Sequence, residues 1–151
     1  QLPEAGRPEV WHQTGKQHHA ATLLNYEKAG VTGRVDAFIT DMDEAYGWAD
    51  LVICRSGALT VSELAAAGVP ALLVPFPYAV DDHQTANARY LEAVGAAWII
   101  QQADLDVTSI VTLLTEKNDR SLLAVMAEKA RSVARYDAGE VVAGVCLENM
   151  K

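Results

Sequence analysis

One stretch in the middle of the chain constrains the fold more than any other. Two short apolar runs, Leu51–Cys54 and Ala71–Val74, flank a segment of helical composition. The turn falls at Ser56–Gly57, since glycine tolerates backbone angles that other residues avoid, and Gly68 followed by Pro70 ends the helix. The stretch therefore predicts a strand, a tight turn, a helix and a parallel strand, which together form a βαβ unit.

The start of this helix carries the first indication of function. Thr60–Glu63 fits a capping box, with Thr60 as the N-cap residue and Glu63 three positions later. A helix that follows a parallel strand points unpaired N–H groups and the positive end of its dipole into the crevice where α/β sheets bind ligands. Small residues at positions 56–58 would let a phosphate approach the backbone. The pattern indicates phosphate or nucleotide binding about as strongly as it indicates a well-capped helix in a parallel sheet.

The composition limits the class of protein and its partners. The chain has 151 residues, a normal length for one domain, and a formal net charge of −8. An acidic balance argues against nucleic acid and against an anionic membrane surface as partners. No apolar run reaches the length of a membrane span. The two cysteines, Cys54 and Cys146, are interpreted as reduced, core-type thiols.

Strand and helix signals alternate along the first two thirds of the chain and become wholly helical after it. The expected strands lie at residues 9–12, 35–39, 51–54, 71–74 and 97–100. The expected helices lie at residues 16–29, 42–49, 60–67, 83–94, 108–115, 120–134 and 138–150. This order predicts an α/β fold of the Rossmann-like type, a doubly wound parallel sheet with helices on both faces and an all-helical C-terminal end.

Ligands of such folds bind at the carboxyl ends of the strands, and polar residues gather in the loops expected there. They are His12, Lys16, Arg55, Ser56, Thr60, Glu63, Asp81, Asp82, His83, Gln84 and Asn87. From the local pattern alone, Glu63 is a helix cap or a ligand of a ribose diol. Arg55 pairs with a phosphate or with a nearby carboxylate.

Metal binding and nucleophilic catalysis find weaker support. Asp41 and Asp43 resemble a metal-binding pair, but both fall at an expected helix start, where acids are favoured anyway, with Asp41 as the cap. His18 and His19 are neighbours within an expected helix, so they cannot chelate from one face. Cys54 is too deeply embedded in an apolar run to act as a nucleophile. We therefore expect no metal site.

Several stretches, taken together and in this order, are similar to one family. They are His12–Gly15, Phe38–Ile39, Asp50, Cys54–Leu64, Gly68–Pro70, Val74–Pro77 and Asp82–Asn87. The run Arg-Ser-Gly-Ala-Leu-Thr-Val-Ser-Glu at residues 55–63 is highly specific. Across nearly its whole length the chain resembles the MurG family of bacterial glycosyltransferases, which add N-acetylglucosamine to the lipid-linked muramyl-pentapeptide precursor of peptidoglycan.

The resemblance implies the C-terminal, sugar-nucleotide-binding half of a two-domain enzyme of the GT-B fold. By position, Phe38 and Ile39 would form the uracil wall, with the Ile39 backbone reading the base edge. Glu63 would hold the ribose hydroxyls, and Gln84 would contact hydroxyls of the donor sugar. The helix start facing the diphosphate would be Ala58, Leu59, Thr60, Val61 and Ser62. Supporting positions would be Arg55, Ser56, Gly57, His83 and Asn87.

The activity implied by the resemblance is an inverting transfer from UDP-N-acetylglucosamine to the lipid-linked acceptor, which converts lipid I to lipid II. No catalytic residue can be named in this chain, and no tightly bound cofactor is expected, with stimulation by a divalent cation left open. The expected partners are the nucleotide donor and the lipid-linked acceptor. The expected location is the cytoplasmic face of the bacterial inner membrane, held peripherally.

The family's C-terminal half opens with a strand and a Gly-Gly-Ser-type loop, which should precede Gln1. We therefore expect residues 1–151 to be a fragment that does not transfer sugar by itself, with acceptor and membrane contacts mainly in the missing half. Two rival interpretations stay open. One is a donor-binding subunit of a split glycosyltransferase, and the other is a different UDP-sugar enzyme of GT-B fold, such as an epimerase.

Overall fold

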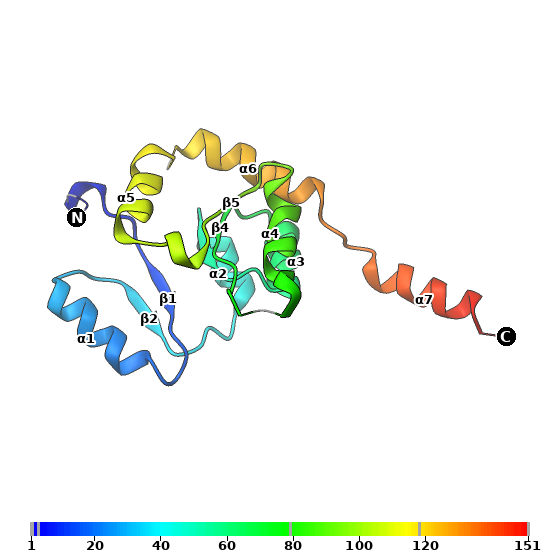
Figure 1. Ribbon diagram of the computed structural model, residues 1–151, viewed down its shortest axis with the longest axis horizontal. Coiled ribbons are helices and arrows are strands. Elements are labelled where there is room, and N and C mark those ends of the chain that lie inside the picture. Colours follow the sequence, from blue (N-terminus) through cyan, green and yellow to red (C-terminus); the bar gives the residue numbers. More distant parts are fainter. Residues whose placement is uncertain (1, 3, 79, 118, 151) are drawn as a thin grey trace. The chain divides into compact units, whose positions relative to one another are not determined.

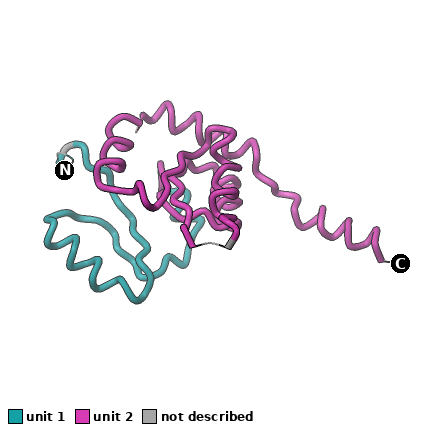
Figure 2. Tube along the Cα trace, in the orientation of Figure 1, with its two compact units in different colours: residues 1–48 teal, residues 49–151 magenta. Residues whose placement is uncertain are grey.

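The computed structural model describes residues 2, 4–78, 80–117 and 119–150. The chain divides into two compact units, residues 1–48 (unit 1) and residues 49–151 (unit 2), shown in different colours in Figure 2. Every described strand pairs in parallel with its neighbour. The predicted α/β class is therefore confirmed, although the described strands form two separate ladders, one within each unit, rather than one continuous sheet.

Unit 1 is a small β-α-β-α arrangement. Its elements are η1 (Glu4–Gly6), β1 (Trp11–Gln13), α1 (His19–Ala29), β2 (Arg34–Asp36) and α2 (Met42–Trp48). α1 begins three residues later than predicted, after a turn that follows Gly15, and ends as predicted at Gly30, whose φ is 60°. The Oδ1 atom of Asp41 accepts a hydrogen bond from the Glu44 N–H at 2.9 Å, so the predicted cap of α2 is confirmed.

Unit 2 begins with a three-stranded parallel sheet in the order β3-β4-β5. Its elements are β3 (Val52–Cys54), α3 (Ala58–Ala67), β4 (Ala71–Leu73), η2 (Val80–Asp82), α4 (His83–Glu92), β5 (Ala97–Ile99), η3 (Gln102–Asp104), α5 (Val107–Glu116), α6 (Arg120–Ser132) and α7 (Ala138–Glu148). Ile53, Leu72 and Trp98 lie side by side across the ladder. The central strand β4 is buried along its whole length.

The core of unit 2 forms where α3, α4 and α6 pack together (Figure 1). Leu64, Ala88 and Ala130 are fully buried there, one from each helix. α3 ends at Gly68, whose φ of 69° suits glycine. Arg131 lies over this glycine and donates a long hydrogen bond, 3.5 Å, to the Ala67 carbonyl. The end of α3 and the last turn of α6 are thereby held together.

The predicted capping box at Thr60 and Glu63 is wrong. α3 begins at Ala58, and its N-cap is Gly57, which has extended backbone angles and makes no side-chain capping bond. The helix starts two residues early because the small Gly57 and Ala58 allow it to follow the turn directly, and the Gly57 carbonyl accepts the first helical bond from Val61 at 3.0 Å. Glu63 consequently lies in the second turn, beyond the reach of a capping side chain.

The two cysteines differ in their surroundings. Cys54 is half-buried, and burial raises the pKa of its thiol to about 11, so it is a poor nucleophile near neutral pH. Cys146 is exposed on α7, a helix with no buried residue among those described, so its interpretation as a core-type thiol is wrong. In the described ranges, no helix has both the length and the apolar character needed to span a bilayer.

Candidate functional site

The turn between β3 and α3 is built around a buried serine. Ser56 is fully buried, with 0% of its surface exposed, and its hydroxyl donates to the Gln84 main-chain carbonyl at 2.8 Å. The side-chain amide of Asn87, also in α4, donates to the Ser56 carbonyl at 3.1 Å. Residues 84 and 87 are three apart in α4 and so lie on one helical face. The turn that starts α3 is thus fastened to the first turn of α4.

The loop after β4 joins the same cluster. Gln84 accepts a hydrogen bond from the Phe76 N–H through Oε1 at 3.0 Å. Arg55 donates from Nη1 to the carbonyls of Val74 and Pro75, at 3.2 and 3.1 Å. The loops that follow β3 and β4 therefore meet at the first turn of α4, as the predicted convergence of strand ends requires.

Among the described residues Arg55 pairs with no carboxylate, and its pairing with a phosphate stays a prediction. Besides the two carbonyls, its Nη2 donates to Gln102 Oε1 at 2.6 Å, and its guanidinium carbon lies 5.4 Å from the centre of the Phe76 ring. The contact with Gln102 is a charge-assisted hydrogen bond to a neutral amide. Arg55 thus links three loops of unit 2 and leaves a fixed positive charge beside the start of α3.

The first turn of α3 presents its backbone rather than its side chains. The N–H groups of Ala58, Leu59 and Thr60 precede the first helical bond of α3, so they have no partner within the helix. Val61 is buried in the core, which leaves only its main chain to contact a ligand. The turn can bind an anion through oriented N–H groups and the positive end of the helix dipole.

Two further residues of α3 follow this turn. Ser62 is exposed, and its hydroxyl donates back to the Ala58 carbonyl at 3.0 Å. Glu63 is exposed on the next turn. With the capping role excluded by the helix start, only the ribose-binding alternative for Glu63 stays a prediction.

The segment that leads into α4 is strained. Asp81 and Asp82 both have φ of 52°, a left-handed conformation that is uncommon for residues other than glycine. The Thr85 hydroxyl donates to Asp82 Oδ1 at 2.6 Å, and this bond holds Asp82 in place. Strain of this kind gathers at ligand-binding sites. The two strained aspartates lie immediately before His83, which is exposed, and Gln84.

In unit 1, the candidate base-binding residues lie in a loop. The strand predicted at residues 35–39 ends at Asp36, so Phe38 and Ile39 follow it. Phe38 is 66% exposed, whereas Ile39 is 9% exposed. The Ile39 N–H donates to Gln13 Oε1 at 2.7 Å, and the Thr14 N–H donates to the Asp36 carbonyl at 3.0 Å. The loop thus combines an anchored aliphatic residue with an open aromatic ring.

Sequence reasoning missed a polar cluster on the same ladder. The Trp11 indole N–H donates to Asp36 Oδ2 at 2.7 Å, and Arg34 Nε lies 2.9 Å from the same oxygen. The guanidinium of Arg34 also stacks on the Trp11 ring, 3.7 Å from its centre. The bond from Trp11, followed by Arg34, lowers the pKa of the Asp36 carboxyl against a smaller opposing effect of burial. Residues 34 and 36 share one face of a strand, a signal that the sequence contained.

The remaining candidates stand apart from these groups. His12 Nδ1 lies 3.3 Å from the Tyr26 hydroxyl, and His19 Nε2 lies 3.1 Å from the Val35 carbonyl. Of the two histidines expected inside the same helix, His18 is the N-cap residue and only His19 lies in α1, as its first residue. Among the described residues, no group of three or more histidines, cysteines or carboxylates could hold a metal ion.

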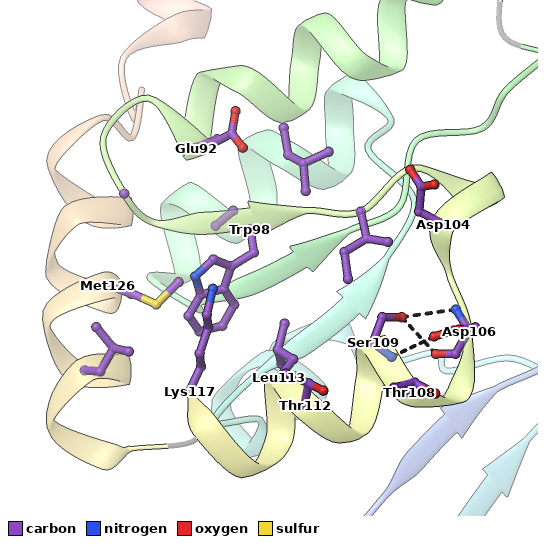
Figure 3. Close-up of a pocket in the computed structure, with 15 residues that line it drawn as sticks. Glu92, Trp98, Asp104, Asp106, Thr108, Ser109, Thr112, Leu113, Lys117 and Met126 are labelled. Carbon is purple, nitrogen blue, oxygen red and sulfur yellow. Dashed lines mark hydrogen bonds between the residues drawn. The ribbon is translucent and has the colours of Figure 1, made fainter.

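A cavity of about 800 Å³ lies elsewhere in unit 2, between β5, α5 and α6 (Figure 3). Trp98, Leu113 and Met126 line it, and Lys117 lies 5.5 Å from the centre of the Trp98 ring. Its other charged lining residues are acidic: Glu92, Asp104 and Asp106. Asp106 is already bonded to the Ser109 N–H at the start of α5, at 2.7 Å. A lining with three carboxylates and one lysine disfavours a diphosphate.

A parallel α/β fold with an open helix start between converging strand ends defines a nucleotide-binding class of domain. The chain belongs to glycosyltransferase family 28, since residues 1–142 match the model of its C-terminal domain. The resemblance inferred from the motifs is therefore confirmed at the level of the family and its fold.

Named relatives agree with the family. The chain is 57% identical, over 92% of its length, to the UDP-N-acetylglucosamine--N-acetylmuramyl-(pentapeptide) pyrophosphoryl-undecaprenol N-acetylglucosamine transferase of Methylococcus capsulatus. It is 52% identical over 98% of its length to the enzyme of the same name from Pseudomonas putida KT2440. The crystal structure of Acinetobacter baumannii MurG superposes on 95% of the chain with a TM-score of 0.87 at 46% identity. The chain spans 40 and 42% of the two relatives' lengths and 45% of the crystallised chain.

Proposed function

We propose that this chain is the donor-binding part of an inverting glycosyltransferase that moves N-acetylglucosamine from UDP-N-acetylglucosamine to the lipid-linked muramyl-pentapeptide, converting lipid I to lipid II. The observation that carries the proposal is the 57% identity to a transferase named for this donor and acceptor. The open first turn of α3, beside the arginine that links three loops, supports it independently. A departing nucleoside diphosphate gathers negative charge, and oriented N–H groups stabilise that charge.

Each residue group takes the role that its position favours. In unit 2, the backbone of residues 58–62 binds the diphosphate, Glu63 accepts hydrogen bonds from the ribose hydroxyls, and Gln84 contacts the sugar. Arg55, Ser56, Gly57, His83 and Asn87 support these groups. In unit 1, Phe38 offers its exposed ring to the uracil, and the Ile39 backbone reads the base edge. The transfer also needs a general base for the acceptor hydroxyl, and we assign none to this chain.

The acceptor-binding and membrane-binding roles are proposed for the longer protein. The relatives are named for a lipid-linked acceptor, and the chain corresponds to less than half of their length. We propose that most acceptor contacts lie outside residues 1–151 and that the enzyme attaches peripherally to the cytoplasmic face of the bacterial inner membrane. The net charge of −8 fits a part that does not itself touch anionic lipid.

The direct test is isothermal titration of the purified protein with UDP-N-acetylglucosamine, with UDP-glucose as the matched control. Binding of the first with clear preference over the second supports the proposal. Equal affinity for both would favour a different UDP-sugar enzyme, and no binding of either by a folded protein that spans the length of its relatives would refute the donor role.

We further propose that no metal is held at Asp41 and Asp43. Asp41 already caps α2 through Oδ1. Replacing both residues with asparagine, which also caps helices, should leave activity little changed at any magnesium concentration. A large loss of activity that excess Mn²⁺ restores would contradict this. Stimulation by free divalent cation is a separate question, and titration with EDTA answers it.

A further inference from the structure

Two aromatic side chains are open to solvent in the loop that follows β4. Tyr78 is 81% exposed and Phe76 is 40% exposed. Their rings meet edge to face with centres 5.5 Å apart, so they form one apolar surface rather than two scattered side chains. Aromatic area left in water adds nothing to the stability of the fold, and a paired exposed surface is typical of a binding site.

Both the main chain and the ring of Phe76 are held. Its N–H donates to Gln84 Oε1 at 3.0 Å, and the guanidinium carbon of Arg55 lies 5.4 Å from the centre of its ring. Arg55 is in turn bonded to two carbonyls of the same loop. Tyr78 therefore has a fixed aromatic neighbour, while most of its own surface is left in water.

The bond between Phe76 and Gln84 places this aromatic pair beside the proposed donor site. In the proposed function, the diphosphate binds at the first turn of α3 and the donor sugar binds at Gln84. For the transfer, the acceptor hydroxyl has to come within about 3–3.5 Å of the reacting carbon of that sugar. The group that carries the hydroxyl therefore lies next to the donor sugar, in the space that the loop after β4 borders.

We propose that Phe76 and Tyr78 bind the sugar ring of the acceptor, with Tyr78 making the main contact. This inference rests on the proposed function and deepens it, because it assigns an acceptor contact to the part of the enzyme that binds the donor. One face of a pyranose ring presents C–H groups, whose small positive charge suits the negative face of an aromatic ring. The relatives are named for an N-acetylmuramyl acceptor, which contains such a ring.

The test uses a protein that spans the length of its relatives, with UDP-N-acetylglucosamine and a water-soluble, short-chain analogue of the lipid-linked acceptor. Tyr78→Ala should raise the KM for the acceptor roughly three- to tenfold. The kcat and the Kd for UDP-N-acetylglucosamine should stay within about twofold, because the ring contributes to acceptor binding alone. Tyr78→Phe keeps the ring, so its acceptor KM should match that of the wild type.

Tyr136 provides a matched control. It is 73% exposed and lies between α6 and α7, far along the chain from this loop. Tyr136→Ala removes a similar exposed ring and should leave the acceptor KM unchanged. An equal rise in both alanine variants, or an unchanged acceptor KM in Tyr78→Ala, would overturn the inference.

Two further outcomes would assign the rings to another ligand. A weaker affinity of Tyr78→Ala for UDP-N-acetylglucosamine, with the acceptor KM unchanged, would place Tyr78 against the donor sugar. A loss that appears only with acceptor in lipid vesicles, and not with the soluble analogue, would place it against the membrane. Either result overturns the inference and leaves the proposed function standing, whereas a folded wild-type protein that transfers no sugar refutes both.

Chemical modification gives a readout that does not depend on variants. Tetranitromethane nitrates exposed tyrosine rings, and mass spectrometry locates the product. UDP together with the soluble acceptor should slow the nitration of Tyr78, whereas UDP alone should not. Equal protection by UDP alone, or no protection when the acceptor is bound, would overturn the inference.

Discussion

The two loops assigned to the nucleotide, one in each unit, are built differently although each follows a parallel strand. The turn before α3 contains a fully buried serine and is tied to α4 and to the loop after β4. The loop after β2 relies mainly on the bond between Ile39 and Gln13, and Phe38 is 66% exposed. The comparison indicates a firmly held turn in unit 2, where we propose that phosphate and sugar bind, and a loop with fewer bonds in unit 1. Preorganisation matters where charge develops, since a fixed group does not have to reorganise during the reaction.

The largest expected difference between the units is in stability. Leu64→Ala, at a fully buried position in α3, should reduce the free energy of unfolding by about 2–5 kcal/mol. Leu24→Ala, at a position in α1 that is 52% exposed, should cost about 0.5 kcal/mol or less. Guanidinium denaturation of both variants measures the contrast. Similar losses would show that unit 1 depends on a core as much as unit 2 does.

The second-largest effect is expected for Glu63→Ala, which should lower the affinity for the donor. Loss of charge-assisted bonds to ribose hydroxyls costs about 1.5–3 kcal/mol of donor affinity. The loss of stability should be smaller than the loss of donor affinity, because α3 starts at Ala58 and Glu63 does not cap it. Calorimetry and thermal melting of the same samples separate the two effects, with Glu63→Gln as the uncharged control. A variant that melts early and keeps its donor affinity would return Glu63 to a structural role.

Gln13→Ala tests how firmly the loop of unit 1 is held. It removes the side-chain partner of the Ile39 N–H and should cost about 0.5–1.5 kcal/mol locally. Amide hydrogen exchange at Ile39 should become faster by the corresponding factor, while Gln13→Glu, which keeps an acceptor, should exchange nearly as slowly as wild type. Unchanged exchange in the alanine variant would mean that the rest of the loop fixes Ile39 by itself.

The smallest expected effect is on pH dependence. The pKa of the Asp36 carboxyl is lowered in the folded state, chiefly by the bond from Trp11. Because the pKa of Asp36 is lower in the folded than in the unfolded protein, its ionised carboxylate stabilises the fold. This contribution is fully present above pH 3.8, the ordinary pKa, and is lost as the pH falls through the lowered pKa. Trp11→Phe should therefore raise the Asp36 pKa towards 3.8 in an NMR titration. A pKa that does not move in this variant would assign the shift to Arg34 instead.

Much of the fold could be predicted because its signals are local. The left-handed glycines at 30 and 68 end their helices where the sequence indicated, and the order of strands and helices follows from short apolar runs and their spacing. The prediction of a capping box at Thr60 was wrong for a local reason too. The Ser/Thr-x-x-Glu pattern does not reveal that a glycine can start the helix earlier without any side-chain cap.

The contacts within the candidate site were beyond sequence reasoning. Ser56 meets residues that lie 28 and 31 positions away in the chain, and Arg55 meets one that lies 47 positions away. Polar residues at several strand ends predicted that such loops would converge. The spacing of residues along the sequence does not predict which hydroxyl will bond to which carbonyl. The Trp11, Arg34 and Asp36 cluster was missed because Arg34 fell outside the predicted strand, and because the sequence does not state that residues 11–13 and 34–36 pair.

The glycine that ends α3 has a consequence for how this chain can vary. A Cβ atom at Gly68 would lie 2.6 Å from Arg131 Cγ, too close for any side chain unless the arginine moved. Even asparagine, which often tolerates a left-handed backbone, would displace it. Residues 68 and 131 therefore change most easily together. A shorter side chain at 131 would leave room for asparagine at 68, whereas with arginine at 131 any side chain at 68 requires the arginine to move. Substitution at one position is conditional on the other, so a combinatorial library over the two should contain folded members, such as asparagine at 68 with a short side chain at 131, that the single-site tolerances exclude.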